Sequence, residues 1–219
     1  GAPPMPRPKS YAWPAPDADG ICLAQTTAGA GAFVINGALL DKQATMQGVA
    51  RVVLPGIQRT VSITCAADIS AVNFTITGTD LRGAAVTETL AGPDTTPTTV
   101  ETTARFATIT SVTVDDAVGT NTTIGTGTTG VTNWFTFDYW ISPFSVSLQA
   151  DISGTINYTV RTTNDDVQTD SSPAVTAVSG MSGATGDAAA SLTVPWRAVQ
   201  AIVNSSTDGT LDLFILQAG

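Results

Sequence analysis

The residue types that most often carry out catalysis are scarce in this sequence. Its 219 residues include no histidine, so the commonest general base and metal ligand is missing. The sequence also lacks GxSxG, HExxH, a P-loop and a GxGxxG followed by a helix. Gly29 and Gly31 precede FVIN, which reads as a strand. We therefore expect a protein that is not an enzyme, with no catalytic residues and no cofactor.

Carboxylates are the remaining groups that could bind a ligand. Asp17 and Asp19 in the stretch DADG resemble the start of a calcium loop, but the later acidic ligand of such a loop is missing. The acidic pair at 115–116 could supply oxygen ligands from a second loop, and the Asn and Asp residues at 164–166 and 170 could do so from a third. Because Asp beside Gly or Asn is typical of solvated turns, we favour turns, keep calcium as the alternative, and predict no metal site.

The two cysteines, Cys22 and Cys65, are too few to indicate a disulfide scaffold. Cys65 lies in the alternating run VSITCA, where a small buried side chain fits. We favour two free buried thiols. A disulfide stays the alternative, because pairing depends on proximity in space.

Charge and composition narrow the class of protein further. The net charge is -9, and the nine Lys and Arg residues are spread along the chain, whereas phosphate binding needs clustered cations. We expect no nucleic-acid partner. No stretch of about 18 apolar residues is present, so we also expect no membrane span. Charged residues make up only 12% of the chain, and the abundant Thr, Ser, Asn and Gly favour strands and turns.

Apolar and polar residues alternate along much of the chain, which is the pattern of half-buried strands. Val61, Ile63 and Cys65 alternate with polar residues, and Phe74 and Ile76 do the same. We predict an all-β protein with two tandem antiparallel β-sandwich or jelly-roll-like domains. They span residues 18–128 and 134–219, and a linker at 129–133 joins them.

The two halves contain matching segments. SITCAADISAVNFTIT at 62–77 aligns with SVSLQADISGTINYTVR at 145–161 if Gly154 is treated as an insertion. Each reads as a strand, a short turn and a second strand, with Phe74 and Tyr158 at the same inward position. We interpret the match as a domain duplication. Its alternative is a common hairpin pattern recurring in a Thr-rich chain.

The first 17 residues form a distinct Pro-rich segment. Proline fixes φ and removes an N–H donor, which excludes helix and central strand. The sequence predicts an extended N-terminal arm that docks on a neighbouring subunit, the alternative being a tail that is free or folds back on its own domain. The predicted partner-binding residues of the arm are Pro3, Pro4, Met5, Pro6, Pro8, Tyr11, Trp13 and Pro14.

A second aromatic-rich stretch opens the second half. Its alternation is typical of a strand packed on a core or a subunit interface, and a carbohydrate-stacking platform is the alternative. The predicted interface residues are Trp134, Phe135, Phe137, Tyr139 and Trp140.

Three segments resemble a family of structural proteins of tailed bacteriophages. They are SYAWPAPDADGICLAQ, FTITGTDLRGAAVTETLAGP and VPWRAVQAIVNSSTDGTLDLFILQAG, and the resemblance covers nearly the whole chain. It implies a non-enzymatic virion protein, assembled in the host cytoplasm and built of β-sandwich domains.

Within that family, a capsid decoration or cement protein is the favoured role. Such a protein would bind the major capsid protein or other virion proteins and stabilise the shell, as a homo-oligomer for which we suggest a trimer. The alternatives are a tail, neck or fibre-adaptor component of the virion and a glycan-binding adhesin module.

Overall fold

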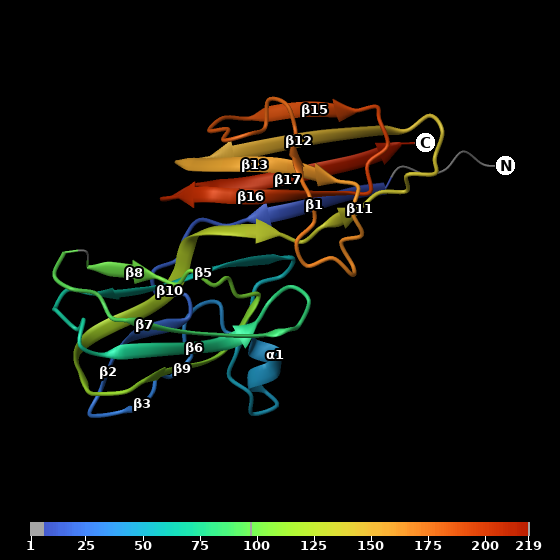
Figure 1. Ribbon diagram of the computed structural model, residues 1–219. Coiled ribbons are helices and arrows are strands. Elements are labelled where there is room, and N and C mark those ends of the chain that lie inside the picture. The colour runs from blue at the N-terminus through green and yellow to red at the C-terminus, as the bar shows by residue number, and fades with distance from the viewer. Residues whose placement is uncertain (1–6, 97, 219) are drawn as a thin grey trace. The chain divides into compact units, whose positions relative to one another are not determined.

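The computed structural model describes residues 7–96 and 98–218, and the chain divides into two compact units. The first sandwich comprises residues 16–128, and the second comprises residues 7–15 together with 129–218. Strands form nearly all of the regular structure (Figure 1), which confirms the predicted all-β, antiparallel, sandwich-like architecture. The helix of the described residues is the single turn α1 (Lys42–Thr45), capped by the Asp41 side chain, which accepts hydrogen bonds from the N–H groups of Gln43 and Ala44.

The first sandwich consists of two antiparallel sheets. One has the strand order β2 (Cys22–Thr27), β10 (Val118–Thr132), β5 (Ile57–Cys65) and β8 (Thr99–Glu101). The other has β3 (Gly31–Ala32) and β4 (Val52–Val53) beside β9 (Thr108–Val114), followed by β6 (Asn73–Thr79) and β7 (Ala85–Ala91).

The second sandwich is built in the same way. One sheet has the order β1 (Arg7–Trp13), β17 (Thr210–Ala218), β12 (Ser145–Ser153) and β15 (Ala188–Leu192). In the other sheet, β11 (Phe135–Thr136) pairs with β16 (Ala198–Ser206), which is followed by β13 (Ile156–Thr163) and β14 (Thr176–Ala177).

The two sandwiches share one topology. Strands β5 to β10 of the first sandwich match strands β12 to β17 of the second, one for one and in chain order. Matching strands also lie in matching sheets. The pairings also repeat: β5 with β8 matches β12 with β15, and β6 with β9 matches β13 with β16. Strand β2, the neighbour of β10, corresponds to β1, the neighbour of β17. A one-for-one match of this kind is the result expected of domain duplication.

Side chains at the matching positions repeat as well. Phe74 and Tyr158 are both fully buried, as the aligned segments predict. Asn73, which precedes Phe74, donates a side-chain hydrogen bond of 2.7 Å to Asp115. In the second sandwich Asn157 occupies the same place and accepts one, also 2.7 Å long, from Asn204. The correspondence between the two sandwiches therefore extends to a polar contact beside each buried ring.

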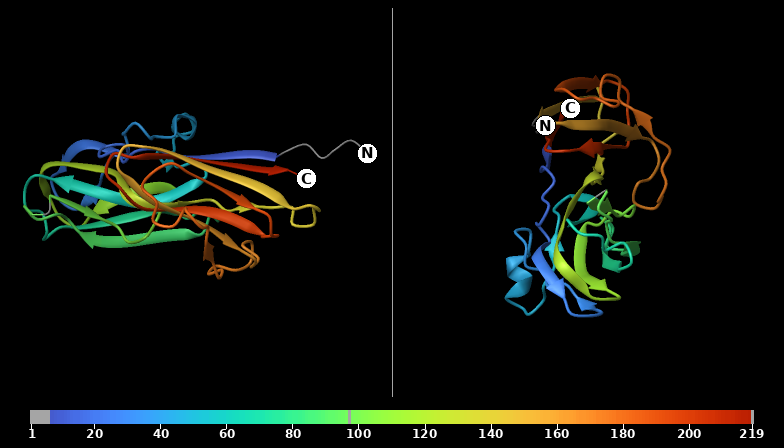
Figure 2. Two further views of the ribbon diagram at one scale, coloured as in Figure 1. Left: turned by 90° about the horizontal axis from the view of Figure 1, so that it is seen from above. Right: turned by 90° about the vertical axis from the view of Figure 1, so that its left-hand side faces the viewer.

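Two predicted boundaries are wrong. Residues 7–13 are not a separate arm but strand β1, which pairs along its whole length with β17 (Figure 2). The predicted linker at 129–133 is largely strand, because β10 continues to Thr132 and its Gly130 and Val131 pair with β16. Thr-rich sequence is found in strands as well as in linkers, so the composition of residues 129–133 did not show that they belong to a strand.

Candidate interaction surface

Two of the arm residues that were predicted to bind a partner are not available for binding in this fold. Tyr11 and Trp13 point into the second sandwich and are buried. Pro8 and Pro14 are exposed, Pro8 within β1 and Pro14 directly after it. Because β1 is an edge strand, a proline can be accommodated there where a central strand could not hold it. Residues Pro3, Pro4, Met5 and Pro6 lie outside the described part of the chain.

The predicted aromatic interface is a short strand and loop at residues 134–144, most of which packs on the second sandwich. Phe137 is buried and makes edge contacts with Phe135 and Phe144, with ring centroids 5.6 and 5.8 Å away. Phe135 itself pairs with Val199 as part of β11. These rings are mainly core, which agrees with the first of the two interpretations offered by the sequence.

Polar contacts hold the same loop in place. The buried side chain of Gln217 accepts a 3.0 Å hydrogen bond from the Asp138 N–H and donates one of 2.8 Å to the Asp138 carbonyl. The guanidinium of Arg161 lies 5.4 Å from the ring centre of Trp134, and that of Arg197 lies 5.6 Å from Tyr139. Cation–π contacts of this kind occupy one face of each ring and help to fix the position of the two side chains.

Trp140 is the exception among the predicted interface residues. The residue is 83% exposed, although its backbone N–H donates to the Asp138 side chain and its ring centroid lies 5.1 Å from that of Tyr139. Tryptophan is a common anchor of protein interfaces, because one side chain buries a large area. The arrangement presents a single large apolar group on a loop that is already ordered.

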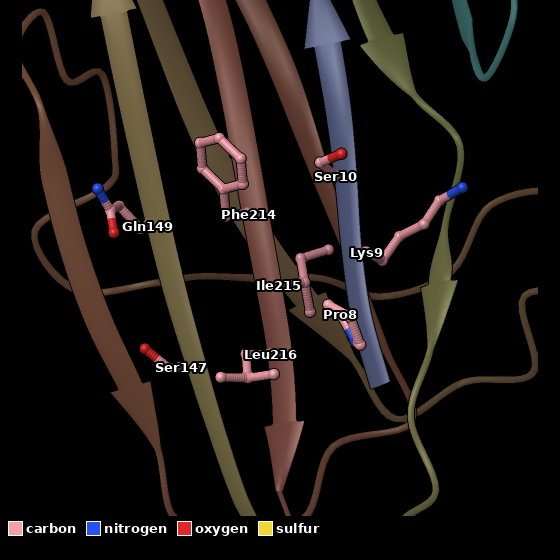
Figure 3. Close-up of a pocket in the computed structure, with 8 residues that line it drawn as sticks. All are labelled: Pro8, Lys9, Ser10, Ser147, Gln149, Phe214, Ile215 and Leu216. Atoms are coloured by element: carbon pink, nitrogen blue, oxygen red, sulfur yellow. The ribbon is translucent and has the colours of Figure 1, made fainter. Parts of the chain in front are cut away.

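A shallow groove lies on the outer face of the sheet β1–β17–β12 (Figure 3). Its volume is about 590 Å³, and its centre is formed by Phe214 and Leu216, which are 44% and 42% exposed. The cross-strand partners of these residues on β1 are Ser10 and Pro8. Lys9 is the one charged residue of the lining, which is completed by Ser147, Gln149 and Ile215.

Sequence reasoning missed this groove. The signal was the run LDLFILQ, in which Leu211, Leu213 and Ile215 form the buried face of β17 while Phe214 and Leu216 are apolar on the other face. A half-buried strand normally carries polar residues on its outer face. Phe214 and Leu216 depart from that pattern.

Within the described residues, the acidic stretches form turns. The Asp165 and Asp166 side chains accept hydrogen bonds from the N–H groups of Ala174 and Gln168, and Asp170 accepts one from Ser172. Hydrogen bonds from Asn73 lower the pKa of the Asp115 carboxyl. Within the described part of the chain, no group of three or more Cys, Asp or Glu side chains is placed to hold a metal ion.

Both cysteines are free and buried, as favoured from the sequence. Burial raises the pKa of the Cys22 thiol to about 12, so it stays protonated near neutral pH, and the thiolate is the reactive form. We predict that an aromatic disulfide reagent at pH 8 labels neither thiol in the native protein within minutes, and labels both at once in denaturant. Fast labelling of either cysteine without denaturant would contradict this packing.

Across the described residues, no helix is both long enough and apolar enough to cross a membrane.

When the chain is compared with known proteins, no family model matches it, and no curated protein does either.

Proposed function

We propose that this chain is a non-enzymatic structural protein of a phage virion, with capsid decoration as its role. The starting point is the resemblance of three segments to structural proteins of tailed bacteriophages. An all-β architecture of two matching sandwiches suits a protein that serves as a rigid structural part and catalyses no reaction. The observation that carries the proposal is Trp140, which is 83% exposed on a loop that Gln217 and two arginines hold in place.

An exposed tryptophan on an ordered loop is suited to attachment. Association costs translational and rotational freedom and the ordering of interface side chains. Because the loop is already held, little further ordering is needed when Trp140 enters a pocket on a shell protein. The groove around Phe214 and Leu216 supplies a second apolar contact on the same sandwich. Lys9 is the one charged residue of that groove, so its share of the attachment should depend only weakly on salt.

Replacing Trp140 with alanine is predicted to weaken attachment without unfolding the protein. Truncation of a central aromatic anchor costs about 2 kcal/mol or more, which corresponds to about a 30-fold loss of affinity. The measurement is binding of the purified variant to particles that were assembled without this chain. Met46→Ala is the matched control, because Met46 is 89% exposed but belongs to the first sandwich. Equal binding by the Trp140→Ala variant and the wild type would refute the role of Trp140.

Imaging of the particle tests the proposed function itself. Antibody against this chain should label the icosahedral shell at regular positions in electron micrographs. Label confined to the tail or neck would replace decoration with the tail-component role. Absence of the chain from purified particles, together with specific signals on a glycan array, would instead favour an adhesin.

A further inference from the structure

Asn36 and Gly37 lie at a bend between β3 and α1 of the first sandwich (Figure 1). Asn36 is the one asparagine of the sequence that is followed by glycine. In an unfolded chain the nitrogen of such a glycine attacks the side-chain carbonyl of the asparagine readily. The reason is that glycine has no side chain to obstruct the approach and adopts the required backbone conformation easily.

In the folded chain both of the groups that would react are held by hydrogen bonds. The backbone N–H of Gly37 donates to the Ile21 carbonyl, 3.0 Å away. The side-chain oxygen of Asn36 accepts a 2.9 Å hydrogen bond from the Leu23 N–H. Attack requires the first of these hydrogen bonds to break and the Asn36 side chain to rotate away from Leu23. The bend must therefore open before the reaction can proceed.

Close backbone packing restrains the same bend. Gly37 is buried, although Asn36 beside it is exposed. A Cβ atom at Gly37 would lie 2.3 Å from the carbonyl carbon and oxygen of Gly20, so the two backbones are in direct contact. The Leu39 N–H continues this contact with a 2.9 Å hydrogen bond to the Gly20 carbonyl. A bend packed this closely has no space for an additional backbone atom.

We propose that Asn36 is a site of spontaneous deamidation that the native bend protects, and that the isoaspartyl product prevents the bend from closing again. The Gly37 nitrogen loses its proton and bonds to Asn36 Cγ, ammonia leaves, and a cyclic succinimide forms. Water then opens the ring at either carbonyl. One product is aspartate, and the other is isoaspartate, whose backbone is longer by one methylene group. The inference rests on the first sandwich alone and is independent of the proposed function.

The two products should behave differently in the fold. An aspartate at residue 36 has the same length as asparagine, and its carboxylate can accept the hydrogen bond from the Leu23 N–H in the same place. Isoaspartate instead adds a backbone atom next to Gly37, which then cannot return to its position against Gly20. A chain that opens once and forms isoaspartate is therefore changed irreversibly.

Peptide mapping by mass spectrometry tests whether the native bend protects Asn36. At pH 8 the folded wild-type chain should lose the Asn36 amide about tenfold or more slowly than the same chain in denaturant, because only local opening releases the reacting groups. Asn36→Gln is the control, and it should react far more slowly in denaturant, since its longer side chain closes a ring less readily. Equal rates for the folded and the denatured wild type, or an Asn36 that stays intact in denaturant, overturn the proposal.

Hydrogen exchange of the Gly37 amide measures the opening of the bend independently. Exchange and deamidation both require this N–H to leave the Ile21 carbonyl, and deamidation also requires rotation of the Asn36 side chain. The fold should therefore slow deamidation by at least the factor by which it slows exchange. Deamidation that is slowed less than exchange would show that the reaction does not need the bend to open, and the proposal would be wrong.

Asn36→Asp separates the effects of the two products. Isoaspartyl chains that are formed in denaturant and returned to native buffer should melt at a lower temperature than the wild type. They should also be cut faster by proteases near residue 36, because the bend stays open. The Asn36→Asp variant carries the same additional charge without the additional backbone atom, so it should melt close to the wild type. Equal melting temperatures for the isoaspartyl chain and the wild type would show that the bend closes in spite of the modification, which overturns the proposal.

Discussion

Trp13→Ala is expected to lower the free energy of unfolding of the second sandwich by about 3–5 kcal/mol, the usual cost of truncating a fully buried aromatic side chain. Trp13 is only 1% exposed and lies at the end of β1, opposite Leu211 on β17. For a domain of about 100 residues the loss corresponds to a fall in melting temperature of about 15 °C or more. Denaturant titration followed by far-UV circular dichroism measures it. Deletion of residues 1–13 should have a larger effect, since it removes the edge strand.

Trp140→Ala supplies the control for this experiment. It makes the same chemical change at a position that is 83% exposed, and its unfolding midpoint should stay close to that of the wild type. The two variants thus separate folding from attachment: Trp13→Ala weakens the fold and Trp140→Ala weakens binding. If Trp13→Ala unfolds at the wild-type denaturant concentration, β1 is not an integral strand and the prediction of a separate docking arm is restored.

Gly78→Ala is predicted to destabilise the first sandwich by about 3 kcal/mol, at the upper end of the usual cost of overpacking. A Cβ atom at Gly78 would lie 1.8 Å from the Thr108 carbonyl oxygen, a backbone atom that a rotamer change cannot move. The close approach comes from a β-bulge, since the register of β6 and β9 shifts between Thr77 and Gly78. Relief of the clash requires part of the β6–β9 pairing to separate.

Two comparisons make the Gly78 prediction specific. Gly119→Ala also changes a strand glycine, but a Cβ there meets no atom within 4 Å, so its stability should be unchanged or slightly increased. In the second sandwich the position equivalent to Gly78 is Thr162, which pairs with Val199 where the register is regular. A side chain is therefore accepted at this place in the topology when the bulge is absent. Equal melting temperatures for Gly78→Ala and Gly119→Ala would show that the bulge does not constrain residue 78.

The all-β class and the match between the two halves could be predicted from sequence pattern alone. Alternation of apolar and polar residues depends on the pleat of a single strand, so it can be read without knowing which strand lies next to it. Val61, Ile63 and Cys65 are buried as their spacing predicts. The aligned segments at 62–77 and 145–161 likewise predicted that Phe74 and Tyr158 occupy equivalent cores, and both are fully buried.

The pairing of distant segments and the exposure of individual side chains could not be predicted in this way. Strand β1 joins β17, some two hundred residues later in the chain, and a pairing so distant leaves no signal in local composition. An edge strand needs hydrogen bonds on one side only, so Pro8 is compatible with β1 although proline-rich sequence suggested a free arm. Trp134 and Trp140 are the same residue type in the same stretch, yet an arginine covers one and the other is exposed. The exposure of a side chain depends on neighbours that come from several strands and meet only in the folded chain.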